Sequence, residues 1–322
     1  MSRTCGGAVL FDAVEKEALR RILWRLSEFS GVRVLTYCIM KNHFHVLAEV
    51  PDQKAWLQDH FEGADGEQKL MHHLRILYSK SYVEQLQAEL AEWRRLRHHH
   101  LAEKRIAALK KRFCDISVFI KEVKERFSRW YNKRHERKGT LWMDRFKSVL
   151  VEGKGDPLLT MAAYIDLNPV RAGIVSDPKD YRWCGYAEAL GGNRECQRGI
   201  CRVTGRDEDG WRRQGAAEGY RQMLFDTAVE QKNAEGEVQR RGVSRERAQE
   251  VRLERGKLSA KELIRQRVRY FSDGAALGSR EFVEEVFERQ RGSFSPRRRS
   301  GARRMPRTEE PFYTLRSLVV DS

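Results

Sequence analysis

The stretch from Glu67 to Lys138 contains neither glycine nor proline. Charged and apolar residues follow one another there at helical spacing, for example at Leu86 and Leu90. Because glycine and proline are the residues that most often end a helix, so long a run without them favours helix throughout. We therefore predict one long helix or a helical hairpin, inserted at about 67–138 between strands of the surrounding fold.

A helix and two strands are predicted ahead of this stretch. Apolar residues recur at helical spacing over residues 12–29, and Gly31 ends that helix. Residues 32–40 are rich in β-branched and aromatic side chains, and a second such segment runs from 43 to 50. Only Lys41 and Asn42 separate the two segments, which predicts a tight antiparallel β-hairpin.

The second of these strands begins with His43-Phe44-His45. Side chains on a strand alternate between its two faces, so His43 and His45 share one face and Phe44 points to the other. Two imidazoles about 7 Å apart on a rigid strand can chelate one divalent ion. Taken alone, the pattern is also typical of a structural or surface pair of histidines.

Tyr164 is a second candidate for chemistry. It lies in a short helix predicted over about 157–167, with Asp156 as its N-cap and Pro169 as its stop. Asn168 follows four residues later and shares the face of Tyr164. A tyrosine hydroxyl, with a pKa of about 10, is a poor nucleophile unless a metal activates the phosphate that it attacks. The alternative is a core aromatic residue with one polar atom.

A third feature is the segment over residues 139–148, which leads into a strand predicted at 146–151. It offers Arg145 and Lys147 to phosphate groups and Trp142 as a surface on which a base could stack. An ordinary strand entry with a buried tryptophan explains the same residues.

The balance of charge favours a polyanionic partner. Lysine and arginine total 62 against 46 acidic residues, a net charge of +16, while 40% of the residues are hydrophobic, enough for a core. Nucleic acid is the first expectation and an anionic membrane surface the second. No apolar run reaches the ~18 residues of a membrane span, and the first residues do not resemble a signal peptide, so we expect a cytoplasmic protein.

The cysteines and the C-terminal part carry weaker signals. Six cysteines without a CxxC pair are expected to be free thiols. Beyond about residue 206 the chain is rich in arginine, with helices predicted at 244–271 and 279–287. We interpret 206–322 as an accessory basic region that binds nucleic acid; a surface for a partner protein would look the same.

Three motifs in order resemble those of the REP-associated tyrosine transposases, a group of single-tyrosine HUH transposases in which HUH stands for His, hydrophobic residue, His. The resemblance covers about residues 1–190, the expected catalytic domain. The matching segments are Tyr37 to Leu47, Leu141 to Ser148, and Tyr164 to Gly173.

The resemblance implies an α+β, ferredoxin-like fold and a site in which His43 and His45 bind Mg²⁺ or Mn²⁺. Asn168 stands where relatives can complete the metal site, and Tyr164 stands where they have the nucleophile. Arg171 lies in the third motif and is expected to contact DNA. The implied reaction is cleavage and rejoining of single-stranded DNA at hairpin-forming repeats, through a 5′-phosphotyrosine, without a nucleotide cofactor.

This sequence departs from the family pattern at its start and in the β-hairpin. Relatives have several strand residues ahead of the position of Ser2, so we expect either that the true start of the protein lies upstream of Met1 or that the sheet lacks part of its first strand. Many relatives have proline where this chain has Lys41. Relatives include monomers and dimers, so a homodimer is one expectation.

Two other functions remain open. One is a domesticated relative that binds a DNA or RNA hairpin without cutting it. The other is a metal-dependent phosphodiesterase that uses water, which leaves Tyr164 without a role.

Overall fold

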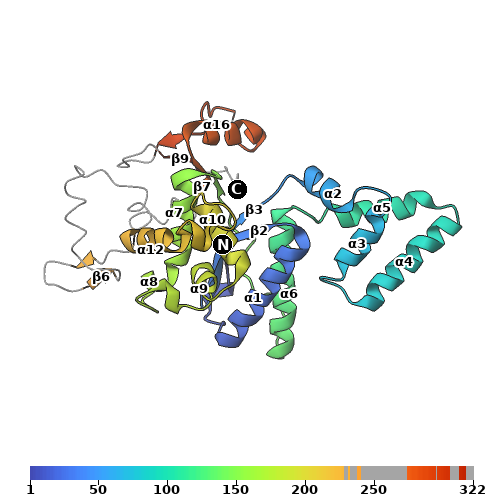
Figure 1. Ribbon diagram of the computed structural model, residues 1–322, viewed down its shortest axis with the longest axis horizontal. Coiled ribbons are helices and arrows are strands. Elements are labelled where there is room, and N and C mark those ends of the chain that lie inside the picture. Colours follow the sequence, from blue (N-terminus) through green and yellow to red (C-terminus); the bar gives the residue numbers. More distant parts are fainter. Residues whose placement is uncertain (228–230, 233–237, 241–273, 295, 305–311, 317–322) are drawn as a thin grey trace. The chain divides into compact units, whose positions relative to one another are not determined.

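Figure 1 shows the computed structural model, which describes residues 1–227, 231–232, 238–240, 274–294, 296–304 and 312–316. The chain divides into two compact units: residues 1–9, 35–47 and 143–322 form the first, and residues 10–34 and 48–142 form the second. Helices and small sheets together make an α+β protein, as predicted. In the part of the chain that the structure describes, no helix is long and apolar enough to cross a membrane. The helix predicted at 244–271 lies outside the described residues.

A three-stranded sheet contains the His43-Phe44-His45 motif. Its strand order is β1-β3-β2, so β3 lies in the middle. The predicted β-hairpin is confirmed, because the backbone N–H of Met40 donates to the carbonyl of His43 at 2.8 Å where β2 turns into β3. The strands are β1 (Ser2–Arg3), β2 (Arg33–Ile39) and β3 (His43–Glu49).

Further backbone bonds extend from both edges of this sheet. Beside β2, the N–H of Ile39 donates to the carbonyl of Trp183 at 2.9 Å. Beside β1, the N–H of Met143 donates to the carbonyl of Arg3 at 2.9 Å, and Lys147 pairs in the same way with Met1 at 3.0 Å. The short segments that follow Trp142 and Arg182 therefore line the two edges.

Helices of the first unit pack closely against β2. The backbone of helix α10 comes so near that a Cβ on Gly199 would lie 2.2 Å from the carbonyl oxygen of Leu35. Glycine is therefore required there by space. The helices of this part are α7 (Gly155–Asp166), α8 (Asn168–Arg171), η2 (Pro178–Asp180), α9 (Gly185–Leu190), α10 (Arg194–Val203), α11 (Gly210–Arg213) and α12 (Ala216–Thr227).

The predicted helix around Tyr164 is present, with altered ends. Helix α7 begins at Gly155 with Lys154 at its N-cap, so Asp156 lies in the first turn and the predicted N-cap was wrong. At the other end, Leu167 is the C-cap, and the short helix α8 follows at once with Pro169 inside it. Proline is tolerated there because the first turn of a helix leaves its N–H without a partner anyway.

A second sheet joins the segment before α7 to the C-terminal part. Its strand order is β4-β7-β9-β8, and β4 pairs with β7 in parallel. The strand predicted at 146–151 is confirmed only as β4 (Leu150–Val151). The other strands are β7 (Gly274–Gly278), β8 (Arg303–Arg304) and β9 (Tyr313–Arg316); a separate pair consists of β5 (Gln231–Lys232) and β6 (Val238–Arg240).

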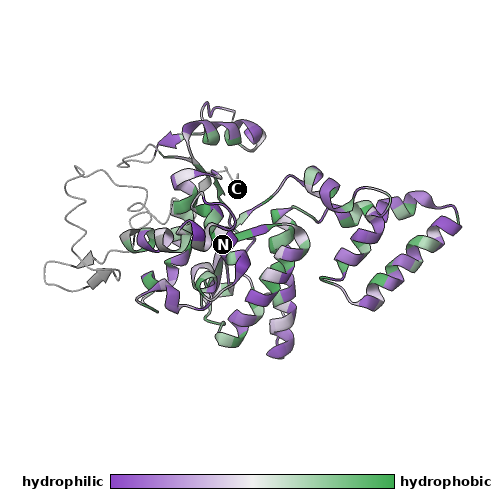
Figure 2. Ribbon diagram, in the orientation of Figure 1, coloured by the Kyte–Doolittle hydropathy of each residue, from purple (hydrophilic) through white to green (hydrophobic). Residues whose placement is uncertain are grey.

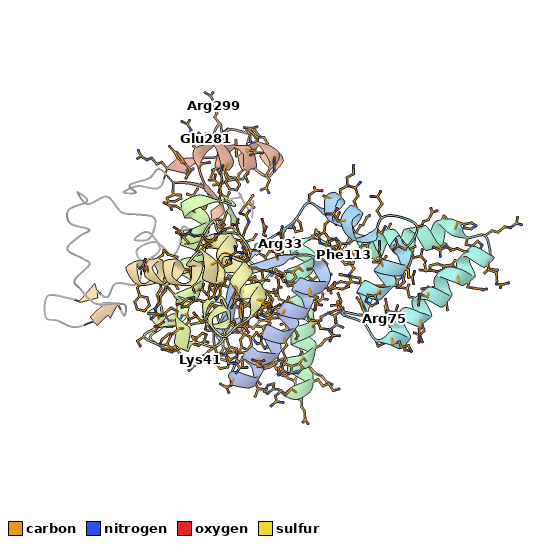
Figure 3. The ribbon with its side chains drawn as sticks, in the orientation of Figure 1. Arg33, Lys41, Arg75, Phe113, Glu281 and Arg299 are labelled. Atoms are coloured by element: carbon orange, nitrogen blue, oxygen red, sulfur yellow. The ribbon has the colours of Figure 1, made fainter. Side chains whose placement is uncertain are left out.

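Helix α16 (Arg280–Arg289) covers this C-terminal sheet and confirms the helix predicted at 279–287. Its N-cap is Ser279, whose hydroxyl accepts from the N–H of Phe282. A short turn, η4 (Arg291–Ser293), follows. A small apolar core lies between α16 and this sheet. Figure 3 shows the side chain of Arg299 pointing away from that core. The core residues are Ala276, Val283, Val286, Phe287, Phe294 and Leu315.

The second unit is helical. Helix α1 (Ala13–Ser30) ends at Gly31 with φ 74°, as predicted, and lies beside α6 (Ile116–Arg134) in Figure 1. Figure 2 shows hydrophilic and hydrophobic residues alternating along its helices. The remaining helices are α2 (Gln53–Phe61), α3 (Gly66–Leu74), α4 (Lys80–Arg95) and α5 (His99–Lys110).

The prediction of one helix or a helical hairpin at 67–138 was wrong, because this stretch contains α3, α4, α5 and α6. The breaks use residues other than glycine and proline. Arg97 and Cys114 adopt positive φ values of 61° and 49°, and Ser79 and Asp115 cap the following helices with their side chains. Such ends are hard to detect in a sequence because few non-glycine residues adopt positive φ.

Candidate functional site

His43 and His45 lie on one face of the three-stranded sheet, as the alternation of strand side chains predicts. Their ring centroids are 5.2 Å apart, and both residues are half-buried. Phe44 is buried and lies opposite Ser2 of β1, so it belongs to the other face. Nδ1 of His43 lies 2.7 Å from Oδ1 of Asn42, an interaction that holds the ring in one orientation and keeps Nε2 available for a ligand.

Both imidazoles are held in the neutral form that binds metals. Burial, with smaller contributions from Arg3 and from the amino-terminal charge, lowers the pKa of His43 to about 4. Burial and the neighbouring His43 lower the pKa of His45 well below its usual value. A lowered pKa means that protons do not compete for these nitrogens near neutral pH.

Tyr164 projects from α7 onto the same face. Its ring centroid lies 5.6 Å from that of His45, in an edge-to-face arrangement. The side chain is buried, with an exposed fraction of 7%. Burial raises the pKa of the hydroxyl, while the charges of Arg171 and Arg3 act to lower it. The structure therefore brings together the three residues that the sequence singled out for chemistry.

Asn168 and Arg171 both contact the helix that carries Tyr164. The Asn168 amide donates to the carbonyls of Tyr164 and Ile165 at 2.9 and 3.2 Å, so the side chain caps α7 and its Oδ1 remains an acceptor. The guanidinium of Arg171 lies 4.9 Å from the Tyr164 ring centroid and donates to the Tyr164 carbonyl at 3.2 Å. Both residues thus position Tyr164.

Asp166 anchors the tyrosine helix from its buried side. Its carboxylate accepts from the Thr36 hydroxyl at 2.9 Å, from the Tyr220 hydroxyl at 2.6 Å and from the Tyr186 N–H at 3.2 Å. These partners come from β2, α12 and α9, so one side chain joins four elements. Asp166 was not singled out in the sequence, where only its place two residues after Tyr164 could have pointed to it.

Arg3 is the other residue that sequence reasoning missed. It lies directly opposite His43 in the antiparallel pair β1–β3, and it is exposed. Directly opposed residues point to the same side of a sheet, with Cβ atoms about 4.5–5.5 Å apart. Arg3 therefore belongs to the face of His43, His45 and Tyr164, but the sequence does not contain the strand register that places it there.

The residues predicted to contact DNA lie in different settings. Arg145 and Lys147 are exposed in the segment beside β1. Trp142 has an exposed fraction of only 9%, and its indole N–H donates to the Lys124 carbonyl at 3.1 Å. The ring packs against Phe11 in the second unit. This burial favours the alternative of a structural tryptophan.

The donor atoms on the site face suit a divalent cation. Two neutral imidazoles supply nitrogen ligands, and Oδ1 of Asn168 is a third candidate, although no hydrogen bond or ring contact joins it to either histidine among the described residues. Within the same residues, no group of three or more His, Cys, Asp or Glu side chains is arranged to hold a metal. Water and phosphate oxygens would have to supply the remaining ligands, as is common for Mg²⁺.

Comparison with protein-family models, with curated proteins and with solved structures gives no match for this chain.

Proposed function

We propose that this protein is a metal-dependent DNA strand transferase that uses a single tyrosine. The observation that carries the proposal is the meeting of His43, His45 and Tyr164 on one face, with ring centroids 5.2 and 5.6 Å apart. A buried tyrosine beside two neutral histidines has the components that phosphoryl transfer to a hydroxyl requires. The net charge of +16 fits a nucleic-acid substrate.

The reaction would exchange one phosphodiester bond for another. The Tyr164 oxygen forms a bond to phosphorus as the bond from phosphorus to the 3′-oxygen breaks, and the tyrosine proton is lost while the 3′-oxygen gains one. The products are a 5′-phosphotyrosine and a free 3′-hydroxyl, and attack by another 3′-hydroxyl reverses the step. A Mg²⁺ or Mn²⁺ ion held by His43 and His45 would supply electrostatic stabilisation at the phosphate.

The family resemblance supports single-stranded DNA at hairpin-forming repeats as the substrate. It also implies a ferredoxin-like sheet, for which the order β1-β3-β2 and the backbone bonds from Met143 and Lys147 to β1 are supporting observations. Under this proposal the basic C-terminal region contacts additional DNA. Action as a homodimer and residence in the cytoplasm belong to the same proposal.

The decisive experiment replaces Tyr164 with Phe. This change removes one oxygen and keeps the ring, so Tyr164→Phe should fold, bind a DNA hairpin and bind Mn²⁺, yet form no covalent adduct that survives denaturation. Tyr186→Phe is a matched control, because Tyr186 bonds to Arg221 and lies on α9. Cleavage by Tyr164→Phe at the wild-type rate would refute the assignment and make water or another tyrosine the nucleophile.

The second candidate function is a domesticated protein that binds a DNA or RNA hairpin without cutting it. It is supported if the wild-type chain forms no adduct on any DNA hairpin while wild type and Tyr164→Phe bind such DNA equally well. The burial of Tyr164 is the observation that favours this second candidate, because a phosphate must reach its hydroxyl before any chemistry. Mn²⁺-dependent exposure of the phenol, measured by ultraviolet difference spectroscopy, would distinguish the two before a substrate is known.

A further inference from the structure

Arg3 is held in a fixed place beside the two histidines. It lies opposite His43 in the β1–β3 register, and its carbonyl accepts from the N–H of Met143 at 2.9 Å. Its neighbours Ser2 and Thr4 are buried, and the N–H of Thr4 donates to the carbonyl of Asn42 at 2.9 Å. The backbone on both sides is thus fixed, while the Arg3 side chain itself is exposed.

The guanidinium of Arg3 has no carboxylate partner among the described residues, whereas many arginines of this chain form ion pairs. Arg171, the other arginine on this face, is already bound to the Tyr164 carbonyl and lies over the Tyr164 ring. The Arg3 guanidinium is exposed on the site face, so its donors are accessible to a ligand. Five donors in a planar fork match the oxygens of a phosphate group.

The positive charge of Arg3 is unfavourable beside a metal site that holds no anion. Arg3 lies directly opposite His43 in the β1–β3 register, so its charge lies close to the face that carries the two histidines. The same charge would repel a divalent cation bound by His43 and His45. An anion bound between the cation and the guanidinium removes this repulsion, because it interacts favourably with both charges.

We propose that Arg3 binds a nonbridging oxygen of the phosphate that Tyr164 attacks. This inference rests on the proposed function for the identity of that phosphate. The division of roles follows from the contacts: Arg171 holds Tyr164 in position, and Arg3 holds the substrate. Lysine at position 3 would keep the charge and lose the paired donors.

The first test needs neither metal nor cleavage. Binding of a labelled oligothymidylate is measured in EDTA at several salt concentrations for wild type, Arg3→Ala and Arg194→Ala. Removing one phosphate contact should make the slope of log K against log[salt] less steep by about 0.7 in Arg3→Ala. Arg194→Ala is the charge-matched control, since Arg194 is exposed at the first position of α10, and it should leave the slope unchanged. A wild-type slope in Arg3→Ala would overturn the proposal.

The second test uses a DNA hairpin that wild type cleaves. Arg3→Ala should slow adduct formation by about 10- to 100-fold, the range for a lost hydrogen bond to a charged group, and Arg3→Lys should recover part of that rate. Mn²⁺ affinity, measured by calorimetry, should not fall in Arg3→Ala. Adduct formation at the wild-type rate would remove Arg3 from the site while leaving the role of Tyr164 intact. Cleavage by Tyr164→Phe would instead refute the nucleophile, and the salt slope would still report on Arg3.

Discussion

At the scale of single residues, the proposed metal binding depends on the protonation state of His43 and His45. An ordinary histidine, with a pKa of about 6.5, loses most of its metal affinity as the pH falls through 6. Burial lowers the pKa of His43 to about 4 and that of His45 well below its usual value. The pair therefore remains neutral across the range in which most histidine sites release their metal.

The expected consequence is a flat pH profile for metal binding. The Mn²⁺ affinity of the folded protein should be nearly constant from pH 7.5 to 5.5 and fall only as the pH approaches the pKa of His43, about 4. Isothermal titration calorimetry at fixed ionic strength measures this directly. The double variant His43→Ala with His45→Ala is the control and should not bind. A tenfold or larger loss of affinity between pH 7.5 and 5.5 would show that burial does not control these pKa values.

Asn42 provides a second prediction at this scale. Its Oδ1 lies 2.7 Å from Nδ1 of His43 and orients the ring. Removing such a partner of a metal ligand typically costs about 10-fold or more in affinity, so Asn42→Ala should bind Mn²⁺ at least that much more weakly. Asn42→Asp keeps an acceptor oxygen for Nδ1 of His43 but loses the amide that donates to the Gly7 carbonyl at 2.7 Å, so it should retain part of the affinity. Equal affinities for wild type and Asn42→Ala would mean that the contact does not orient His43.

At the scale of elements, the tyrosine helix is held by one carboxylate. Asp166 is fully buried and receives hydrogen bonds from residues of β2, α9 and α12. Burial raises its pKa from 3.8 to about 6, although the hydrogen bonds from Tyr220, Thr36 and Tyr186 act in the opposite direction. Near neutral pH the helix therefore depends on a buried charge that these hydrogen bonds must stabilise.

Because the pKa of Asp166 is higher in the folded state than in the unfolded state, the free energy of unfolding should decrease as the pH rises. The stability that Asp166 contributes as a neutral group is complete below pH 3.8 and is lost as the pH rises through about 6. The shift corresponds to about 3 kcal/mol. Asp166→Asn cannot ionise, so the wild-type free energy of unfolding should fall relative to that of this variant by roughly this amount between pH 4 and 7. Urea titrations at both pH values measure the difference; parallel profiles for the two proteins would contradict it.

Close packing of α10 on β2 supplies another prediction. A methyl group at Gly199 would lie 2.2 Å from the Leu35 carbonyl oxygen, so Gly199→Ala should lower the free energy of unfolding by about 1–3 kcal/mol. Gly219 in α12 is the matched control, since nothing lies within 4 Å of its added Cβ. Gly219→Ala should be neutral or stabilising by up to about 1 kcal/mol. Thermal unfolding measures both, and equal effects would mean that the close contact relaxes at little cost.

Local patterns in the sequence located the elements that local chemistry specifies. Helix α1 and strands β2 and β3 were predicted to within a residue or two, because apolar periodicity, Gly31 and the Lys41-Asn42 turn mark their limits. The break between α4 and α5 at Arg97 was not predicted, because a positive φ at an arginine depends on tertiary packing. The face shared by His43 and His45 was predictable for the same reason as the strands, since alternation is local.

Long-range pairings could not be predicted in this way. The position of Arg3 depends on the register between β1 and β3, and the place of Tyr164 beside His45 depends on how α7 packs. The expectation that Tyr164 lies near the two histidines came from the family resemblance and not from local patterns. Nothing in the sequence indicated the position of Arg3, because one-residue slips in a strand reverse the face of every side chain.

At the scale of the whole molecule, the net charge of +16 predicts that the proposed binding of nucleic acid depends strongly on salt. With about six phosphate contacts to a single strand, log K should fall against log[salt] with a slope near −4. In the C-terminal part, Arg299, Arg303 and Arg304 are exposed. Replacing all three with glutamine should make the slope less steep by up to about 2, measured by fluorescence anisotropy with single-stranded DNA. An unchanged slope would exclude these arginines from the DNA contact.

Substitution is a cleaner test of this region than deletion. Removal of the chain from Arg291 onward would also remove β9, which lies between β7 and β8 in the sheet, and Leu315 of the local core. A loss of binding after deletion would therefore mix lost charge with lost structure. The three glutamine substitutions leave both the sheet and the core in place.

The pairing of β4 with β7 also constrains the protein during its synthesis. The N–H of Ser279, just after β7, donates to the carboxylate of Glu152, just after β4, and these residues are 127 positions apart. At about 5–20 residues per second, a ribosome needs roughly 6–25 s to make the intervening chain. During that interval β4 has no strand partner in its sheet, although α7 follows it directly. The nascent chain thus carries the tyrosine helix for many seconds before the strand ahead of it is paired.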